Sequence, residues 1–267
     1  MSSVVTAFGE GVVIARRNLR MIMRVPDLLV NSAVAPAMMT LLFGFVIGGA
    51  IDLPGVSYRE FLLNGIFVQA VLFGAVNTGT AIASDVRNGI VDRLMSMPIS
   101  RSAVLVGRTT SDVVNNAVVI SVTALLGLVV GWRVRSSFLD ALVGFAVLLA
   151  FAYALSWLMA LVGLAAPVPE VVSSTGFTVA IPLGFLSNAY VPIDSMPTVL
   201  GAVAQWNPVS AVVQALRDQF GIVGPAAARP DVWPMQHPVA ASLLWVGLIL
   251  VIAVPLAIRQ YRRAVGR

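Results

Sequence analysis

The sequence predicts an all-α integral membrane protein with six transmembrane helices, built as a single domain over residues 1–267. Two features of its composition lead to this fold class: 58% of the 267 residues are hydrophobic, and only 11% are charged. Soluble domains are typically about 45–50% apolar and about 25% charged. The mean hydropathy of +0.92 shows the same excess. A soluble fold of this length could not bury so much apolar surface, so lipid must surround most of the chain.

Residues 1–27 are predicted to form an amphipathic helix that lies in the membrane interface instead of crossing it. Apolar residues recur from Val4 to Ile22 with three- and four-residue spacing, and the arginines of the second half fall on another face of the helix. This pattern is typical of interfacial helices. Pro26 and Asp27 then end the segment.

Six apolar runs are each close to the roughly 20 residues that cross about 30 Å of hydrocarbon. They cover residues 29–50, 61–84, 113–131, 138–164, 171–191 and 239–258. The chain has no lysine, so its 17 basic residues are all arginine. Most of them fall on the inner side of the membrane if both termini are cytoplasmic. The positive-inside rule therefore predicts a multi-pass protein with both termini in the cytoplasm.

The loop between the second and third spans, residues 85–112, is predicted to hold a short amphipathic helix on the cytoplasmic side. Val86, Ile90 and Leu94 share one helical face, and Pro98 stops the helix. Such a helix can lie on lipid, or it can press into a groove on a partner protein. A solvated linker is the plainer interpretation, and the residues by themselves leave both open.

The connection between the fifth and sixth spans, residues 192–238, is long, rich in proline and placed on the outer side. It contains apolar stretches at residues 196–206 and 209–223. These stretches predict short re-entrant helices that enter the outer leaflet and return. A re-entrant backbone is tolerated at membrane depth only where it is buried in protein or lines a cavity.

The composition also excludes several kinds of site. Cysteine is absent and His237 is the single histidine, so thiolate and His-rich metal sites are excluded, and we expect no metal or cofactor in this chain. A Walker A loop needs a lysine to reach the nucleotide phosphates. If ATP powers this protein, ATP and Mg²⁺ must therefore be bound by another polypeptide. Membrane orientation explains the net charge of +5, so we expect no nucleic-acid partner.

The loop 85–112 carries an ordered motif: an acidic residue, a glycine, an Asp-Arg-Leu triplet, and then Pro, Ser and Arg. The matching residues are Asp85, Gly89, Asp92, Arg93, Leu94, Pro98, Ser100 and Arg101. This motif resembles the conserved loop of the ABC-2 type permeases, especially the daunorubicin/doxorubicin-resistance type. Two further stretches resemble that family in the right order: Leu186–Pro197 followed by Trp206-Asn207-Pro208, and Pro255–Arg263. The chain departs from many relatives at Ile90-Val91.

This resemblance implies the permease subunit of an ATP-driven ABC exporter in the bacterial cytoplasmic (inner) membrane, without an ATPase site of its own. Such permeases work as homo- or heterodimers with two copies of a separate ATPase subunit. The cargo is expected to be amphipathic or lipophilic, such as a drug, an antibiotic or a lipid. The resemblance assigns contact with the ATPase to the N-terminal helix and to these residues of the loop: Asp85, Arg87, Gly89, Asp92, Arg93, Leu94, Met97, Pro98 and Arg101.

Polar and aromatic residues within the spans are candidates for the substrate path. We select the polar Gln69 and Asn77 and the aromatic Phe73 and Phe177. Hydrogen bonding between helices is the plainer interpretation of polar residues in a span. Contact with lipid or with neighbouring helices is the plainer interpretation of the aromatic rings.

Two other functions stay open. A secondary transporter would use an ion gradient, but none of the six apolar runs has an acidic residue or an arginine at mid-depth, where proton and ion relays place such groups. A membrane assembly or sensor protein would show no flux at all. An uncoupler would stop a secondary transporter, whereas mutation of the nucleotide site in a neighbouring ATPase would stop an exporter.

Overall fold

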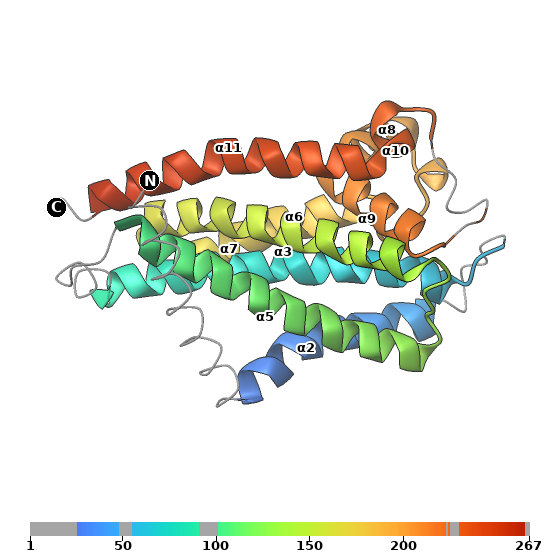
Figure 1. Ribbon diagram of the computed structural model, residues 1–267, viewed down its shortest axis with the longest axis horizontal. Helices are drawn as coiled ribbons and strands as arrows, with labels where there is room; N and C mark the ends of the chain where they lie inside the picture. Colours follow the sequence, from blue (N-terminus) through green and yellow to red (C-terminus); the bar gives the residue numbers. More distant parts are fainter. Residues whose placement is uncertain (1–25, 48–54, 91–100, 223, 225–229, 265–267) are drawn as a thin grey trace.

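The computed structural model describes residues 26–47, 55–90, 101–222, 224 and 230–264 (Figure 1). Within these ranges all regular secondary structure is helical, as the composition predicts. The interfacial helix expected at residues 1–27 lies outside them except for its last two residues. Residues 91–100 of the expected coupling loop lie outside them as well.

Long helices form the body of the structure and run alternately in opposite directions (Figure 1). In chain order they are α2 (Pro26–Leu41), continued by the π-helix η1 (Leu42–Ile47), then α3 (Tyr58–Arg87), α5 (Arg101–Val130), α6 (Phe138–Ala165), α7 (Pro169–Phe185) and α11 (Pro238–Ala264). The shorter helices between α7 and α11 are η2 (Ile193–Ser195), α8 (Thr198–Trp206), α9 (Pro208–Gln219) and α10 (Trp233–Gln236).

The two ends of the bundle differ. Helices α8, α9 and α10 gather at the end where α3 begins, and we call this the α9 end (Figure 1). The C-terminus of α3, the N-termini of α5 and α7 and the C-terminus of α11 lie at the opposite end, which we call the Arg87 end.

Local sequence signals set several helix boundaries. Ser137 caps α6: its Oγ accepts a hydrogen bond from the Asp140 amide at 3.2 Å and donates one to the Asp140 carboxylate at 2.7 Å. Asn207 caps α9, because its Oδ1 accepts a hydrogen bond from the Val209 amide at 2.9 Å. At the other end of the bundle α3 stops before Gly89, which has a left-handed φ of +66° that suits glycine.

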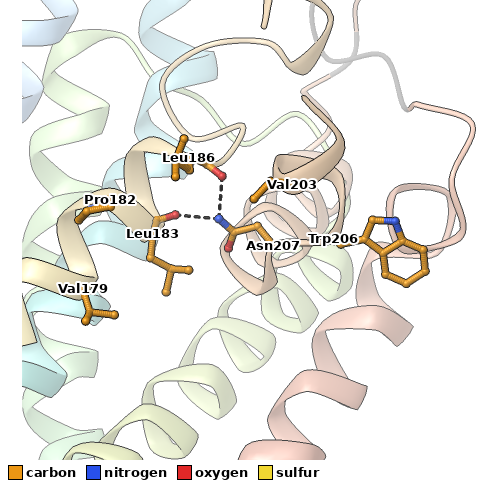
Figure 2. Close-up of a pocket in the computed structure, with 7 residues that line it drawn as sticks. All are labelled: Val179, Pro182, Leu183, Leu186, Val203, Trp206 and Asn207. Carbon is orange, nitrogen blue, oxygen red and sulfur yellow. Dashed lines mark hydrogen bonds between the residues drawn. The ribbon is translucent and has the colours of Figure 1, made fainter. Parts of the chain in front are cut away.

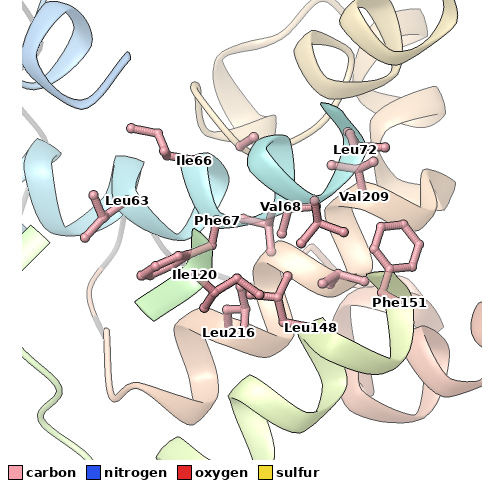
Figure 3. Close-up of a cluster of buried hydrophobic side chains, with 14 of the residues drawn as sticks. Leu63, Ile66, Phe67, Val68, Leu72, Ile120, Leu148, Phe151, Val209 and Leu216 are labelled. Atoms are coloured by element: carbon pink, nitrogen blue, oxygen red, sulfur yellow. The ribbon is translucent and has the colours of Figure 1, made fainter. Parts of the chain in front are cut away.

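Helix α3 is the centre of the core and packs against α5, α6, α7 and α9. Figure 3 shows the buried cluster that joins these helices, which includes Leu63, Ile66, Phe67, Val68, Leu72, Ile120, Leu148, Phe151, Val209 and Leu216. Phe67 is fully buried, and its ring lies edge-on to those of Trp132, Phe145 and Phe220 at centroid distances of 5.4, 6.1 and 6.3 Å. Edge-to-face contacts of this kind add to the free energy gained by burial.

The outer surface of the bundle is apolar too. Val129 and Phe138 each expose 85% of their surface, and Val251 exposes 74%. Soluble proteins rarely expose contiguous apolar surface of this extent, and contact with lipid explains it. The apolar helices therefore support a multi-pass membrane protein.

Among the described residues, four helices are long and apolar enough to cross a membrane: Tyr58–Arg87, Leu105–Val130, Phe138–Ala165 and Pro238–Tyr261. They correspond to the second, third, fourth and sixth expected spans. Helices α8 and α9 meet the same criterion only as a pair, which is bent by 73°. In the first expected span, the apolar helix found among the described residues is Val34–Val46. The complete set of six spans therefore stays a prediction.

Helix α7 is shorter than the fifth expected span at 171–191. Its 17 residues are about 26 Å long, and the helix ends at Phe185. The side-chain Nδ2 of Asn207 donates hydrogen bonds to the carbonyls of Leu183 and Leu186 at 2.8 and 2.7 Å. Because these bonds satisfy carbonyls at the helix C-terminus, the apolar chain can leave the helical path and continue as a buried turn.

Candidate functional site

Three of the four residues selected for the substrate path lie on one face of α3. Gln69, Phe73 and Asn77 are four residues apart, and this spacing places them on the same side of the helix. Gln69 and Phe73 line a small cavity of about 10 Å³ between α3 and α2, together with Met39. Asn77 lies nearer the Arg87 end and is exposed, so the structure does not bring it into this cavity.

The side chain of Gln69 is buried but unpaired. The residue is only 3% exposed, and neither Oε1 nor Nε2 has a hydrogen-bond partner among the described residues. Its Oε1 points at the backbone of α7, where a Cβ added to Gly184 would collide with it. A buried amide without partners costs about 1–3 kcal/mol. Gln69 is therefore available to a polar group that enters between α3 and α7.

The two aromatic residues of the predicted path come together. The rings of Phe73 on α3 and Phe177 on α7 lie at a centroid distance of 5.3 Å with an interplanar angle of 71°. Phe73 stands one helical turn from Gln69. The structure therefore assembles Gln69, Phe73 and Phe177 at one junction between α3 and α7.

An apolar groove that the sequence did not indicate lies between α7 and α8 at the α9 end. It has a volume of about 500 Å³, and Figure 2 shows its lining residues, which are Val179, Pro182, Leu183, Leu186, Val203, Trp206 and Asn207. Both the Nδ2 and the Oδ1 of Asn207 are already used within the chain. The groove therefore offers apolar surface, in a volume that suits drug-sized molecules.

Arg217 of α9 is buried at the α9 end of the bundle. It is 1% exposed, and its guanidinium stacks 3.5 Å above the centroid of the Phe61 ring. Its Nη2 donates hydrogen bonds to the Phe61 carbonyl at 3.3 Å and to the Asn188 carbonyl at 2.7 Å. Arg217 thus connects α9 to α3 and to the turn after α7. Sequence patterning could not find it, because Ser210, Gln214 and Arg217 form a polar stripe that indicates a solvent-facing side, whereas all residues of α9 from 209 to 217 are buried.

The predicted coupling residues that the structure describes lie at the Arg87 end. Asp85 Oδ2 is 3.4 Å from Arg108 Nη1 on α5, and Arg87 Nη1 is 3.6 Å from Glu170 Oε1 on α7. Gly89 follows the end of α3, and Arg101 is the first residue of α5. The remaining residues of the motif lie outside the described ranges: Asp92, Arg93, Leu94, Met97 and Pro98.

Comparison with known proteins decides the family. Residues 10–220 match the model of the ABC-2 type transporter family. The chain belongs to this family. The matched segment of the ABC-2 chain contains the Gln69 junction, the groove between α7 and α8, Arg217 and the charged residues at the Arg87 end.

Named permeases resemble this ABC-2 chain over most of its length. It is 34% identical to the daunorubicin resistance ABC transporter permease protein DrrB1 of Streptomyces coeruleorubidus, over 89% of this chain and 80% of the relative. It is 30% identical to the probable doxorubicin resistance ABC transporter permease protein DrrC of Mycobacterium tuberculosis, over 74% and 69%. The putative transport permease ycf38 of Cyanophora paradoxa is 26% identical, over 81% and 77%. The resemblance seen in the loop motif is confirmed.

Proposed function

We propose that this chain is the permease subunit of an ATP-driven exporter whose ATP is hydrolysed by a separate polypeptide. The observation that carries the proposal is the family match together with the 34% identity to a permease named for daunorubicin resistance. The absence of lysine supports a separate ATPase, because this chain cannot form a Walker A loop. ATP and Mg²⁺ would be bound by that partner.

The proposed cargo is amphipathic or lipophilic, in the class of drugs, antibiotics or lipids. The printed names of the relatives support a drug. The junction of Gln69, Phe73 and Phe177 supports a molecule with both a polar group and an apolar body, because an unpaired amide lies one helical turn from Phe73, whose ring contacts Phe177. Asn77 would extend this path toward the Arg87 end, and the groove between α7 and α8 would receive apolar parts of the cargo at the α9 end.

The proposed topology has six spans, with both termini in the cytoplasm of a bacterial cell. The alternating directions of α2, α3, α5, α6, α7 and α11 support it. In this orientation the Arg87 end is cytoplasmic and the α9 end is outside, with α8 and α9 forming a re-entrant pair. Such a pair is permitted because residues 209–217 of α9 are buried in protein.

The proposed assembly has two permease chains and two ATPase subunits. The N-terminal helix at residues 1–27 and the loop 85–112 would contact the ATPase, with the motif from Asp85 to Arg101 at the centre of that contact. Nucleotide binding would favour one arrangement of the spans and hydrolysis would restore the other. Differential affinity of the two arrangements for nucleotide supplies the work.

The structure suggests how a push at the Arg87 end could be used. The α9 end of α3 is held by the Glu60–Arg135 ion pair at 2.9 Å, by the bond from the Tyr58 hydroxyl to the Tyr190 carbonyl at 3.2 Å, and by Arg217. Helix α3 would therefore tilt about this end when its other end is displaced. A tilt would change the cavity between α3 and α2, which Gln69 and Phe73 line.

The proposal is tested in inside-out membrane vesicles from cells that express the permease with its partner P-loop ATPase, by measuring uptake of daunorubicin. We expect uptake that needs ATP, that persists with an uncoupler, and that is lost when the Walker A lysine of the partner is mutated. Uptake that an uncoupler abolishes and that the partner mutation leaves intact would indicate a secondary transporter. Absence of any flux with daunorubicin and with fluorescent lipids would favour an assembly or sensor protein.

A further inference from the structure

Two ion pairs join the last turn of α3 to two other helices at the Arg87 end. Arg87 Nη1 lies 3.6 Å from Glu170 Oε1 at the start of α7. Asp85 Oδ2 lies 3.4 Å from Arg108 Nη1 on α5. The Nε of Arg108 is in turn 3.8 Å from Asp112 Oδ1, one turn further along α5. The end of α3 is therefore connected to both helices by charge.

These links differ in strength from those at the α9 end. The side chains of Arg87 and Glu170 are 59% and 74% exposed, whereas the pair at the α9 end combines an exposed Arg135 with a Glu60 that is only 6% exposed. The Asp85–Arg108 pair is partly buried. Exposed ion pairs are weak and readily exchanged. They contribute little to the free energy of folding, so a variant that breaks the Arg87–Glu170 pair should leave the fold intact.

We propose that Arg87 and Asp85 are positioning residues that act inside this chain: Arg87 holds α3 to α7 through Glu170, and Asp85 holds α3 to α5 through Arg108. This inference rests on the proposed function. It reassigns two members of the coupling motif, since their charged groups face helices of the same chain instead of the ATPase. Movement that reaches the Arg87 end is then transmitted to α3, α5 and α7 together.

These ion pairs affect the proposed cargo path, because they link the helices that form it. Helices α3 and α7 pack along much of their length and carry Gln69, Phe73 and Phe177 at their junction. If α3 moved without α7, that junction would open in each cycle of ATP binding and hydrolysis. The pair Arg87–Glu170 keeps the two helices in register at the end where force enters, and the pair Asp85–Arg108 does the same for α5.

A charge-swap cycle on Arg87 and Glu170 tests the proposal in the complete complex. The variants are Arg87→Glu, Glu170→Arg and the double variant. We expect each single variant to lower ATP-dependent transport about two- to five-fold, because like charges then face each other. The amount of co-purified ATPase and the thermal midpoint should not change. The double variant should restore transport to the wild-type rate, since the pair is rebuilt with opposite polarity.

The opposite pattern would overturn the proposal. If Arg87 contacted the ATPase directly, Glu170→Arg would leave transport intact, and the double variant would be as impaired as Arg87→Glu. Arg259→Glu is a matched control: this exposed arginine lies at the same end on α11, and the described part of the chain shows no ion pair for it. Wild-type protein without any ATP-dependent transport would refute the proposed function itself, which is a different result.

The link to α5 is tested by neutralisation. We expect Asp85→Asn to reduce transport per ATP hydrolysed about two- to five-fold. Arg108→Gln also removes the pair with Asp112, so the double variant should be impaired as much as Arg108→Gln and no further, because Asp85 acts through Arg108. Additive losses in the double variant would show that the two residues act separately, and would overturn this half of the proposal.

Discussion

Burying the unpaired side chain of Gln69 in a helix bundle is destabilising. Both polar atoms of its side chain lack partners among the described residues, and the cavity beside it, about 10 Å³, is only of the size of one water molecule. The contact with Gly184 shows that α7 approaches α3 closely at this point. A side chain that costs stability in this way is better explained by a role in binding than by packing.

We therefore predict that Gln69→Leu separates stability from transport. The thermal midpoint in detergent should stay equal or rise, because an unpaired polar group is replaced by an apolar one of similar size. Export of a cargo with a hydrogen-bonding group should fall by up to about ten-fold, the value of one hydrogen bond. Gln205→Leu, the same change on half-buried α8, should leave export unchanged. A lower midpoint with normal export would assign Gln69 to helix packing.

Phe67 represents the opposite case of a residue that serves stability. It is fully buried and contacts three other aromatic rings. We predict that Phe67→Ala lowers the free energy of unfolding by about 3–5 kcal/mol. The measurement is denaturant unfolding in detergent, with Phe138→Ala as the control because Phe138 is 85% exposed. Equal losses in the two variants would contradict the position of Phe67 in the core.

At the scale of elements, the junction of α7, α8 and α9 depends on one side chain. Asn207 donates to two carbonyls at the end of α7 and accepts a hydrogen bond from the first turn of α9. It therefore fixes both where α7 ends and the 73° bend between α8 and α9. The groove between α7 and α8 takes its shape from this junction.

We predict that Asn207→Ala destabilises this junction by about 1–3 kcal/mol, because buried carbonyls lose their donor. Hydrogen exchange of the amides in α8 and α9 should quicken, while that of α6 should not. Asn88→Ala is the control, since Asn88 is exposed and its side chain bonds only to Ser84 within the described contacts. Unchanged exchange in α9 would show that Arg217 alone is sufficient to hold the helix.

At the scale of the whole molecule, different interactions hold the Arg87 end and the α9 end. The α9 end of α3 is held by Arg217 through buried hydrogen bonds, whereas the ion pairs at the Arg87 end are exposed in Arg87–Glu170 and partly buried in Asp85–Arg108. In an exporter driven from the cytoplasm, we expect the end of the bundle that moves to be the cytoplasmic end. The proposed topology places it there.

Topology can be tested directly because the chain has no native cysteine. We predict that a cysteine at Ser96, in the loop 85–112, is labelled by an impermeant maleimide only after the cells are permeabilised. A cysteine at the exposed Ser195 in η2 should be labelled in intact cells. Labelling of Ser96→Cys from outside intact cells would reverse the proposed orientation.

The sequence by itself determined that lipid surrounds this protein and that this chain holds no Walker A loop. Apolar runs longer than a bilayer is thick require lipid, and the absence of lysine excludes a Walker A loop wherever the chain folds. The ordered motif around Asp92 led to the family. These features are local or compositional, so they do not depend on which helices become neighbours.

Only the tertiary structure decided the contacts between distant segments. Hydrophobic periodicity and hydropathy could not show that α7 ends at Phe185, because the carbonyls at its end bond to Asn207, the N-cap of the later helix α9. They also could not show that Arg217 is buried, or that Arg87 pairs with Glu170. A polar side chain in a membrane protein must find partners where packing supplies them, and packing joins residues whose proximity the linear sequence does not record.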